Sequence, residues 1–145
     1  MKYYKLIILL TFFYLFNCSD NDTPDSPEVI DVYWNLVNVN GGISGTNEDF
    51  NEGIIKWTFN EFAGTLKIEN NNTDDTKPDG IESGNYTYNI ITSGTSSKTY
   101  LVIDDSEIGS IVVTANELVI DENERSEGTF SDGYIYTFSK TVITE

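Results

Sequence analysis

The 145-residue sequence lacks histidine, has one cysteine, and carries only eight basic residues against 24 acidic ones. Without an imidazole the chain has no ordinary general base for a Ser-His or Cys-His nucleophile. A lone cysteine forms neither an internal disulfide nor an ordinary zinc site. The net charge of −16 repels phosphate backbones, so nucleic acid is not expected as a partner. Nine tyrosines, eight phenylalanines and two tryptophans nevertheless supply the core of one domain.

The first seventeen residues, MKYYKLIILLTFFYLFN, are typical of a secretory signal peptide. Lys2 and Lys5 give a positive start, and an apolar run covers residues 6–16. This run is too short to span a bilayer comfortably. The sequence therefore predicts a signal peptide over residues 1–17.

The cysteine follows this run directly, in LFNC, where an ordinary signal would have small residues at a cleavage site. Leu15 and Cys18 take the outer positions of a motif that resembles the lipobox of bacterial lipoproteins. Phe16 and Asn17 depart from the small residues usual there. The resemblance implies that Cys18 becomes the first mature residue and carries acyl chains such as palmitate, each buried methylene contributing about 0.8 kcal/mol to anchoring. The alternative is an uncleaved signal anchor with an incidental cysteine.

Residues 18–29 predict a flexible tether. They contain the acidic, proline-bearing stretch SDNDTPDSPE and show no hydrophobic periodicity. An acidic run after a lipidated cysteine also resembles the surface-export signals of some Gram-negative lipoproteins. We therefore expect a cell-envelope protein held in the outer membrane by the acyl chains on Cys18, on either the periplasmic or the surface face.

From residue 30 onward the sequence predicts short β-strands separated by polar turns. In IIKWTFN, for example, Ile55, Trp57 and Phe59 fall on one face and polar residues on the other, which is the pattern of a half-buried strand. Two residues, Ala115 and Asn116, separate two of the segments as in a tight hairpin. The eight segments expected as strands cover residues 31–39, 54–60, 65–70, 83–92, 98–104, 107–114, 117–121 and 133–141.

Eight antiparallel strands and no helical periodicity leave two architectures, an up-and-down barrel or a two-sheet sandwich. The stretches YWNLVNVNGGISG, GIIKWTFNEFAGTLKIENNN and DGYIYTFSK resemble the lipocalin-like domains common in Gram-negative lipoproteins. The resemblance covers about residues 30–141. It implies an all-β, eight-stranded antiparallel up-and-down β-barrel over residues 30–145.

In lipocalins a first-strand tryptophan packs under a basic residue of the last strand at the closed base of the barrel. Trp34 and Lys140 match these positions, although Val32 replaces the expected glycine and arginine is more usual than lysine. The alternation of the last segment also places Lys140 on the face of its aromatic residues, where stacking on an indole would stabilise its charge. The alternative is a Lys140 at the barrel rim that reaches water by itself.

No motif predicts a catalytic, metal or cofactor site. The glycine-rich GGISG precedes neither a helix nor a lysine and is not a phosphate loop. The acidic loops NNNTDDTKPDG and DENERSEG do not follow the spacing of a calcium loop, and Arg125 would occupy a ligand position in the second. We expect solvated loops there, and neither an enzyme nor a bound cofactor.

The remaining candidate site is the barrel interior, since a barrel of eight strands holds packed side chains or one small ligand. Its aromatic side chains would either line an apolar pocket with phenolic hydroxyls or fill it, and we expect a mostly filled interior. The sequence thus favours a lipid-anchored envelope protein that binds a small apolar molecule or a partner protein. The alternative is a carboxylate-based hydrolase of envelope glycans, which needs two acids facing each other. The candidate interior residues are Trp57, Phe59, Tyr86, Tyr88, Tyr134, Tyr136 and Phe138.

Overall fold

The computed structural model describes residues 30–94 and 97–144. It shows an all-β fold in which eight antiparallel strands close into a barrel, which confirms the fold class implied by the resemblance. Within these ranges there is no helix, and so none that is long and apolar enough to cross a membrane. The predicted signal peptide 1–17, the lipidation candidate Cys18 and the tether 18–29 lie outside the described residues.

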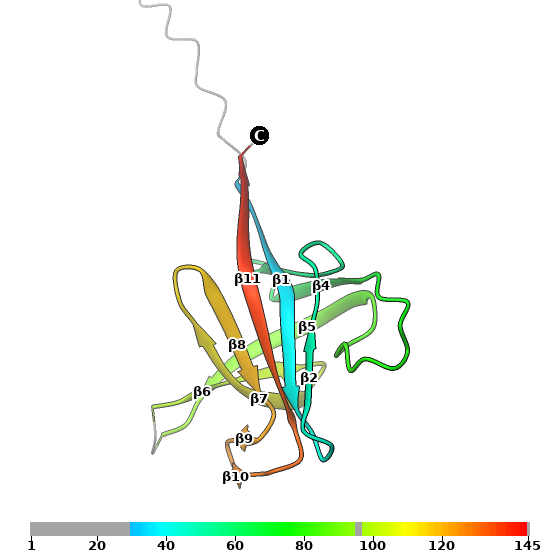
Figure 1. The fold of residues 1–145 in the computed structure, drawn as a ribbon. Helices are drawn as coiled ribbons and strands as arrows, with labels where there is room; N and C mark the ends of the chain where they lie inside the picture. Colours follow the sequence, from blue (N-terminus) through cyan, green and yellow to red (C-terminus); the bar gives the residue numbers. More distant parts are fainter. Residues whose placement is uncertain (1–29, 95–96, 145) are drawn as a thin grey trace, which may run out of the picture.

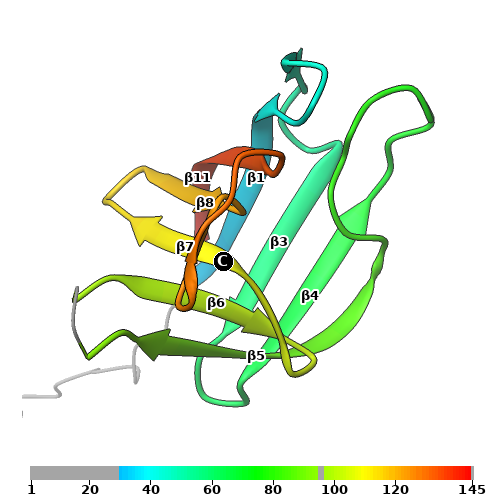
Figure 2. The ribbon, with the colours of Figure 1, turned by 90° about the horizontal axis from the view of Figure 1, so that it is seen from below.

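The barrel strands follow one another around the ring in chain order, with every neighbouring pair antiparallel (Figure 1). Figure 2 shows the ring from below. The strands are β1 (Ile30–Gly41), β3 (Ile55–Asn60), β4 (Thr65–Asn70), β5 (Gly84–Thr92), β6 (Thr99–Ile103), β7 (Ser106–Val113), β8 (Glu117–Asp121) and β11 (Tyr134–Thr144).

The first and last strands close the ring. β1 and β11 pair along their full lengths, from Ile30 opposite Thr144 to Gly41 opposite Tyr134. On its other side β1 meets β3 at Trp34–Trp57 and at the next pair along. Because this closure joins all eight strands in one ring, the two-sheet sandwich is excluded. Figure 1 shows β1 and β11 running together beyond the other strands.

Three short strands lie outside the ring, in segments where the sequence predicted loops: β2 (Thr46–Asp49), β9 (Glu124–Arg125) and β10 (Gly128–Thr129). β2 pairs with β1, and the Asn38 amide donates to Asn47 and Asp49 across this pair. The β9–β10 hairpin is tied to β7, because the backbone N–H and hydroxyl of Ser126 both donate to the Glu107 carboxylate. These segments have no apolar alternation, so strand pairing, and not burial, makes them extended: β2 pairs with β1, and β9 pairs with β10.

Every second side chain of the barrel strands points into a single core, as the period of a strand requires. The most buried of these side chains come from nearly all barrel strands, and burying each large apolar one contributes about 1.5–3 kcal/mol. The fully buried apolar residues include Leu36, Val39, Ile55, Leu66, Leu101, Ile120 and Phe138.

Two β-bulges interrupt the alternation. In β1 the register to β11 shifts between Leu36 and Asn38, so that Leu36 and Val39 both enter the core although they are three residues apart. In β7 the register to β6 skips Ile108, since Gly109 lies opposite Leu101 and Glu107 opposite Val102. The Ile108 side chain packs against the core. Each bulge therefore adds an inward apolar group that a strict period of two would place outside.

The two ends of the barrel differ and are named here for later use. The open end carries the β4–β5 loop (71–83), the β6–β7 turn and the connection from β8 to β11. The base end carries the β3–β4, β5–β6 and β7–β8 connections, together with the projecting ends of β1 and β11.

Candidate functional site

A cavity of about 90 Å³ lies inside the open end of the barrel. Its walls are mostly apolar, and its mouth is marked by half-buried groups from the β4–β5 loop and from the connection after β8. Its volume equals about three water molecules at roughly 30 Å³ each. The interior is therefore mostly filled by side chains. The cavity is lined by Leu36, Trp57, Asp79, Gly80, Ile81, Ile108, Ile120, Glu122, Tyr136 and Phe138.

The inner wall of the cavity is built by Trp57 of β3 and Phe138 of β11, whose ring centroids are 5.0 Å apart. Trp57 is 4% exposed, and its indole Nε1 has no hydrogen-bond partner. It is the one buried side-chain nitrogen or oxygen left unpaired among the described residues. A buried donor without an acceptor costs about 1–3 kcal/mol. The barrel therefore keeps an unused hydrogen-bond donor in a side chain that borders the cavity.

Glu122, directly after β8, places its carboxylate at the mouth. Glu122 Oε2 accepts the backbone N–H of Tyr134 at 2.9 Å, and Oε1 accepts the hydroxyl of Tyr136 at 3.4 Å. The next residue fixes the chain here, since the Asn123 amide accepts the N–H of Gly133 at 2.8 Å and donates to its carbonyl at 3.2 Å. The Glu122 carboxylate is therefore held beside Tyr136 by the backbone N–H of Tyr134 and by the Asn123–Gly133 contacts next to it.

Burial, followed by the Glu122 carboxylate, raises the pKa of the Tyr136 phenol far above its usual value, and Asp79 adds to this effect. The phenol consequently stays protonated at neutral pH and acts as a donor to Glu122. Asp79, Glu122 and Tyr136 all line the cavity.

The β4–β5 loop brings Asp79 and Gly80 over the cavity. Gly80 has φ +84°, and a Cβ there would lie 3.3 Å from Cε1 of Tyr136, so any side chain would be strained and crowded. Asp79 accepts a 2.9 Å hydrogen bond from the Asn72 amide within the same loop. The loop is thus folded tightly onto the ring of Tyr136.

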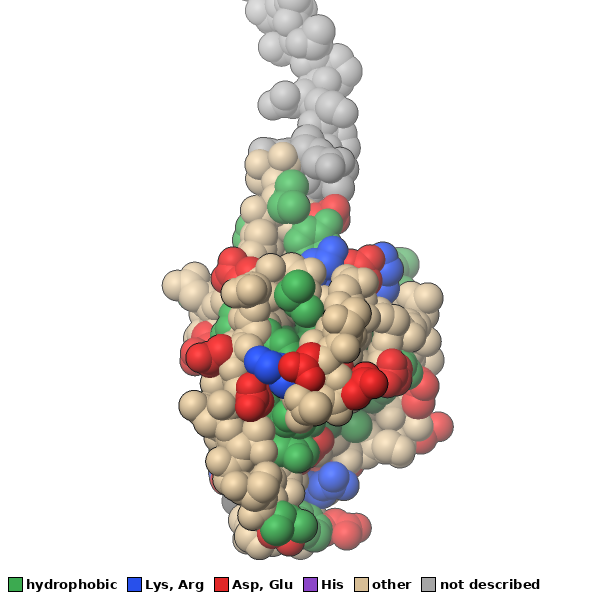
Figure 3. Space-filling view, turned by 45° about the vertical axis from the view of Figure 1, so that its right-hand side comes forward, with side chains coloured by type: hydrophobic (Ala, Val, Ile, Leu, Met, Phe, Trp, Pro, Cys, Tyr) green, Lys and Arg blue, Asp and Glu red, His purple; other side chains and the backbone are tan. Residues whose placement is uncertain are grey.

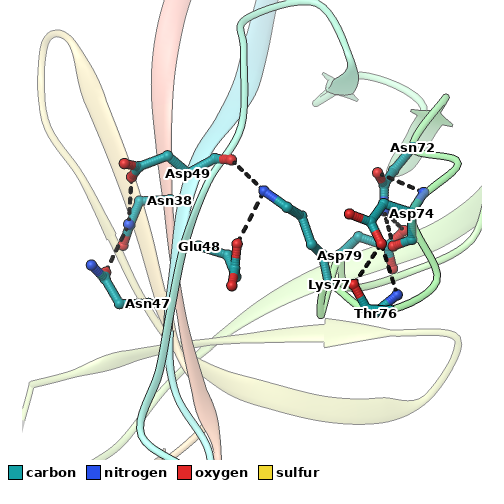
Figure 4. A network of polar contacts seen from close by, with 9 residues as sticks. All are labelled: Asn38, Asn47, Glu48, Asp49, Asn72, Asp74, Thr76, Lys77 and Asp79. Carbon is teal, nitrogen blue, oxygen red and sulfur yellow. Dashed lines mark hydrogen bonds and ion pairs between the residues drawn. The ribbon is translucent and has the colours of Figure 1, made fainter.

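Lys77 ties this loop to β2 (Figure 4). Its Nζ lies 3.0 Å from the Glu48 carboxylate, donates to the backbone carbonyl of Asp49 at 3.2 Å, and stands 5.3 Å from the centroid of the Phe50 ring. β2, absent from the sequence prediction, therefore serves as the anchor of the loop that forms the cavity mouth.

At the base end Trp34 lies directly opposite Lys140 in the β1–β11 register, and Lys140 Nζ is 5.7 Å from the indole ring. Trp34 is 7% exposed, whereas Lys140 is exposed. A shallow apolar depression of about 150 Å³ lies at this end, next to the fully exposed Phe62 turn. Its lining includes Trp34, Phe59, Tyr88, Ile90, Ile111, Val113 and Leu118.

The structure distributes the seven predicted interior residues over the length of the barrel. Trp57, Tyr136 and Phe138 border the open-end cavity, whereas Phe59 and Tyr88 form an edge-on pair 5.0 Å apart at the base end. The other two, Tyr86 and Tyr134, pack against the core but line neither hollow. The seven rings thus fill the barrel more than they surround a common pocket.

Sequence reasoning missed Asp79 and Glu122, because we expected the acids to be solvated in loops. Glu122 had a detectable signal: Leu118, Ile120 and Glu122 share one parity, so the strand pattern carries an acid onto the inward face. Asp79 had no such signal in the sequence, because the place of its loop in the fold is set by contacts with residues far away in the chain, such as those of Lys77 with β2. Within the part of the chain that the structure describes, no three acids or other ligands cluster in a way that could hold a metal ion.

The surface is strongly acidic. On the face in Figure 3, red carboxylate side chains are spread among polar ones, and blue basic side chains lie next to red ones. Four ion pairs join lysines to glutamates in the described ranges, and all four lie outside the cavity. Among the glutamates in these ion pairs, Glu69 has the pKa that is lowered most, to about 2, by hydrogen bonds from Lys56 and then Lys67.

The barrel is consistent with a lipocalin-like fold and is compatible with binding a small molecule at the open end. Comparisons with protein-family models, with curated proteins and with solved structures gave no match.

Proposed function

We propose that this chain is a lipid-anchored protein of the bacterial cell envelope whose barrel binds a compact small molecule at its open end, without catalysis. The observation that carries the binding function is the cavity itself. Apolar walls from several strands converge with a few fixed polar groups, Glu122, Tyr136 and Trp57, which is the usual composition of a ligand site.

The size of the cavity limits the ligand. A carrier of lipid, haem or pigment would need a pocket of at least roughly 300 Å³. The observed 90 Å³ admits only a short group, either a whole small molecule or one end of a longer one. This favours a compact ligand over the bulky hydrophobic cargo that an open barrel would hold.

The anchor rests on the sequence alone. Residues 1–17 with Cys18 support lipid attachment, and the acidic tether would then lead to β1 at the base end. Metabolic labelling with a palmitate analogue should mark the wild-type chain and leave Cys18→Ser unlabelled. Equal labelling of both would refute the anchor, and protease treatment of intact cells would tell the surface face from the periplasmic face.

Binding is tested by filling the cavity. Ile108→Phe places a larger side chain on the cavity wall, while Val112→Phe enlarges a 57% exposed side chain on the same strand. When small amines and alcohols of four carbons are screened, those that bind should raise the melting temperature of the wild type and of Val112→Phe, but not of Ile108→Phe. If none of these compounds stabilises the wild type, the small-molecule function is wrong.

Two acids in one cavity, Asp79 and Glu122, would suit a glycan hydrolase, but the cavity of about 90 Å³ is too small for a sugar ring. A dry cavity of about 150 Å³ is needed for benzene, and a sugar ring with its hydroxyl groups is larger. The partner-protein alternative stays a prediction, and the apolar depression at the base end is the surface that it would use.

A further inference from the structure

The polar groups around the open-end cavity are unbalanced in charge. Asp79 and Glu122 both line it, and no lysine or arginine does so among the described residues. The four ion pairs within residues 30–94 and 97–144 leave both carboxylates without a basic partner. Half-buried carboxylates beside an apolar wall gain more from a nearby cation than solvated ones, because little water screens the pair.

The two carboxylates belong to residues that line one cavity together with Tyr136. Glu122 accepts the hydroxyl of Tyr136, and the raised pKa of that phenol reflects burial first, then Glu122, with Asp79 contributing. The Tyr136 ring lines the cavity, and the Tyr134 ring lies 6.2 Å from it, outside the lining. Aromatic faces attract ammonium groups, so the rings and the carboxylates favour the same kind of ligand.

The inner part of the cavity is apolar and short. With a volume of about 90 Å³ it has room for a group of three or four carbons, judged against roughly 30 Å³ for one water molecule. Trp57 and Phe138 border this part of the cavity, so a short apolar group would lie against their rings.

Resting on the function proposed above, we propose that the ligand is a compact ammonium ion, with its short apolar body against Trp57 and Phe138 and its charged group between Asp79 and Glu122. The protein thus selects small primary amines over neutral or anionic molecules of the same length. The net charge of −16 adds a long-range attraction for such cations.

The experiment titrates the ¹⁵N-labelled full chain with n-butylamine, 1-butanol and butanoate. The two indole N–H signals serve as reporters: Trp57 borders the cavity, and Trp34 lies at the base end as an internal control. Butylamine should shift the Trp57 signal at concentrations about tenfold below those needed for butanol, and butanoate should not shift it. The Trp34 signal should stay in place throughout.

Three substitutions separate the charge effect from general changes. Glu122→Gln and Asp79→Asn each keep a polar side chain of the same shape, and each should weaken butylamine binding by about three- to tenfold without affecting butanol. Glu117→Gln makes the same charge change at the exposed, opposite end of β8 and should leave binding unchanged. Asp79→Asn keeps the test valid if Glu122→Gln unfolds the connection after β8.

The outcomes distinguish this inference from the function beneath it. If butanol shifts the Trp57 signal as strongly as butylamine, or if neither amide variant weakens butylamine binding, the ammonium preference is refuted and the cavity remains a binding site. If none of the three compounds moves the Trp57 signal, both proposals fail. If Glu117→Gln weakens binding as much as Glu122→Gln, the attraction comes from net charge and not from this site.

Discussion

Gly109 on β7 is the position where the structure predicts the largest effect of one added methyl group. A Cβ built there would lie 2.2 Å from the carbonyl oxygen of Asp121, 2.7 Å from its carbonyl carbon and 2.8 Å from Cα of Glu122. All three are backbone atoms at the end of β8 and of the residue after it, so no side-chain rotation relieves the contact. Gly109→Ala must therefore push β7 away from β8.

The size of the effect follows from these contacts. Overpacking a core usually costs about 1–3 kcal/mol, and the upper end applies where backbone has to move. Weakening the ladder between β7 and β8, where Ser110 lies opposite Asp121, adds about 1 kcal/mol per lost hydrogen bond. We expect Gly109→Ala to lower the free energy of unfolding by about 3–4 kcal/mol, a large part of the 5–15 kcal/mol typical of a domain.

The assay is urea unfolding followed by tryptophan fluorescence, with Gly94→Ala as the matched control. A Cβ at Gly94 would meet no atom within 4 Å, and its φ lies outside the left-handed region. Alanine there should be neutral or should stabilise the protein by up to about 1 kcal/mol, through the unfolded chain. If Gly109→Ala and Gly94→Ala unfold within 1 kcal/mol of each other, the close approach of β7 and β8 is refuted.

Three further predictions concern the charged groups. Lys140→Met should lower the free energy of unfolding by about 0.5–1 kcal/mol and change the fluorescence of Trp34, because the cation leaves the indole face; an unchanged spectrum would contradict the stacking. The pKa of Glu69 is lowered to about 2, first by the hydrogen bond from Lys56. The ionised carboxylate therefore stabilises the fold above the ordinary carboxyl range, and this stabilisation is lost as pH falls from about 4.5 to 2. Because the pair is solvent-exposed, Glu69→Gln should remove only about 1 kcal/mol of this acid-dependent stability in urea titrations, and identical pH profiles would refute it. Lys77→Met should increase hydrogen exchange in the β4–β5 loop but not in β7, whereas unchanged exchange would show that other contacts hold the loop.

The alternation of the sequence predicts the barrel strands well because burial decides them. In β3 and β4, for instance, Trp57 and Ile68 are inward and directly paired, as a period of two requires. The same rule fails at the two bulges, where one extra residue lets Val39 and Ile108 face the core out of phase. A bulge is decided by the fit of the two strands, and a single strand's pattern does not contain that information.

The candidate site is less predictable than the fold. The rings of Tyr136 and Phe138 follow from the last strand's alternation, and the number of large rings predicted the mostly filled interior that the structure has. The carboxylates at the mouth depend on where two connections fold back, and Asp79 is positioned through Lys77 and β2, far away in the sequence. Such contacts arise only once the ring is closed.

The pairing of β1 with β11 has a consequence for synthesis of the protein. β1 is made first, yet it has only two register pairs with β3, and its long partner emerges last. At 5–20 residues per second the nascent chain carries this unpaired edge for on the order of 10 s. During that interval the β1 edge is open to pairing with other chains, and any product that stops before residue 134 keeps it open permanently.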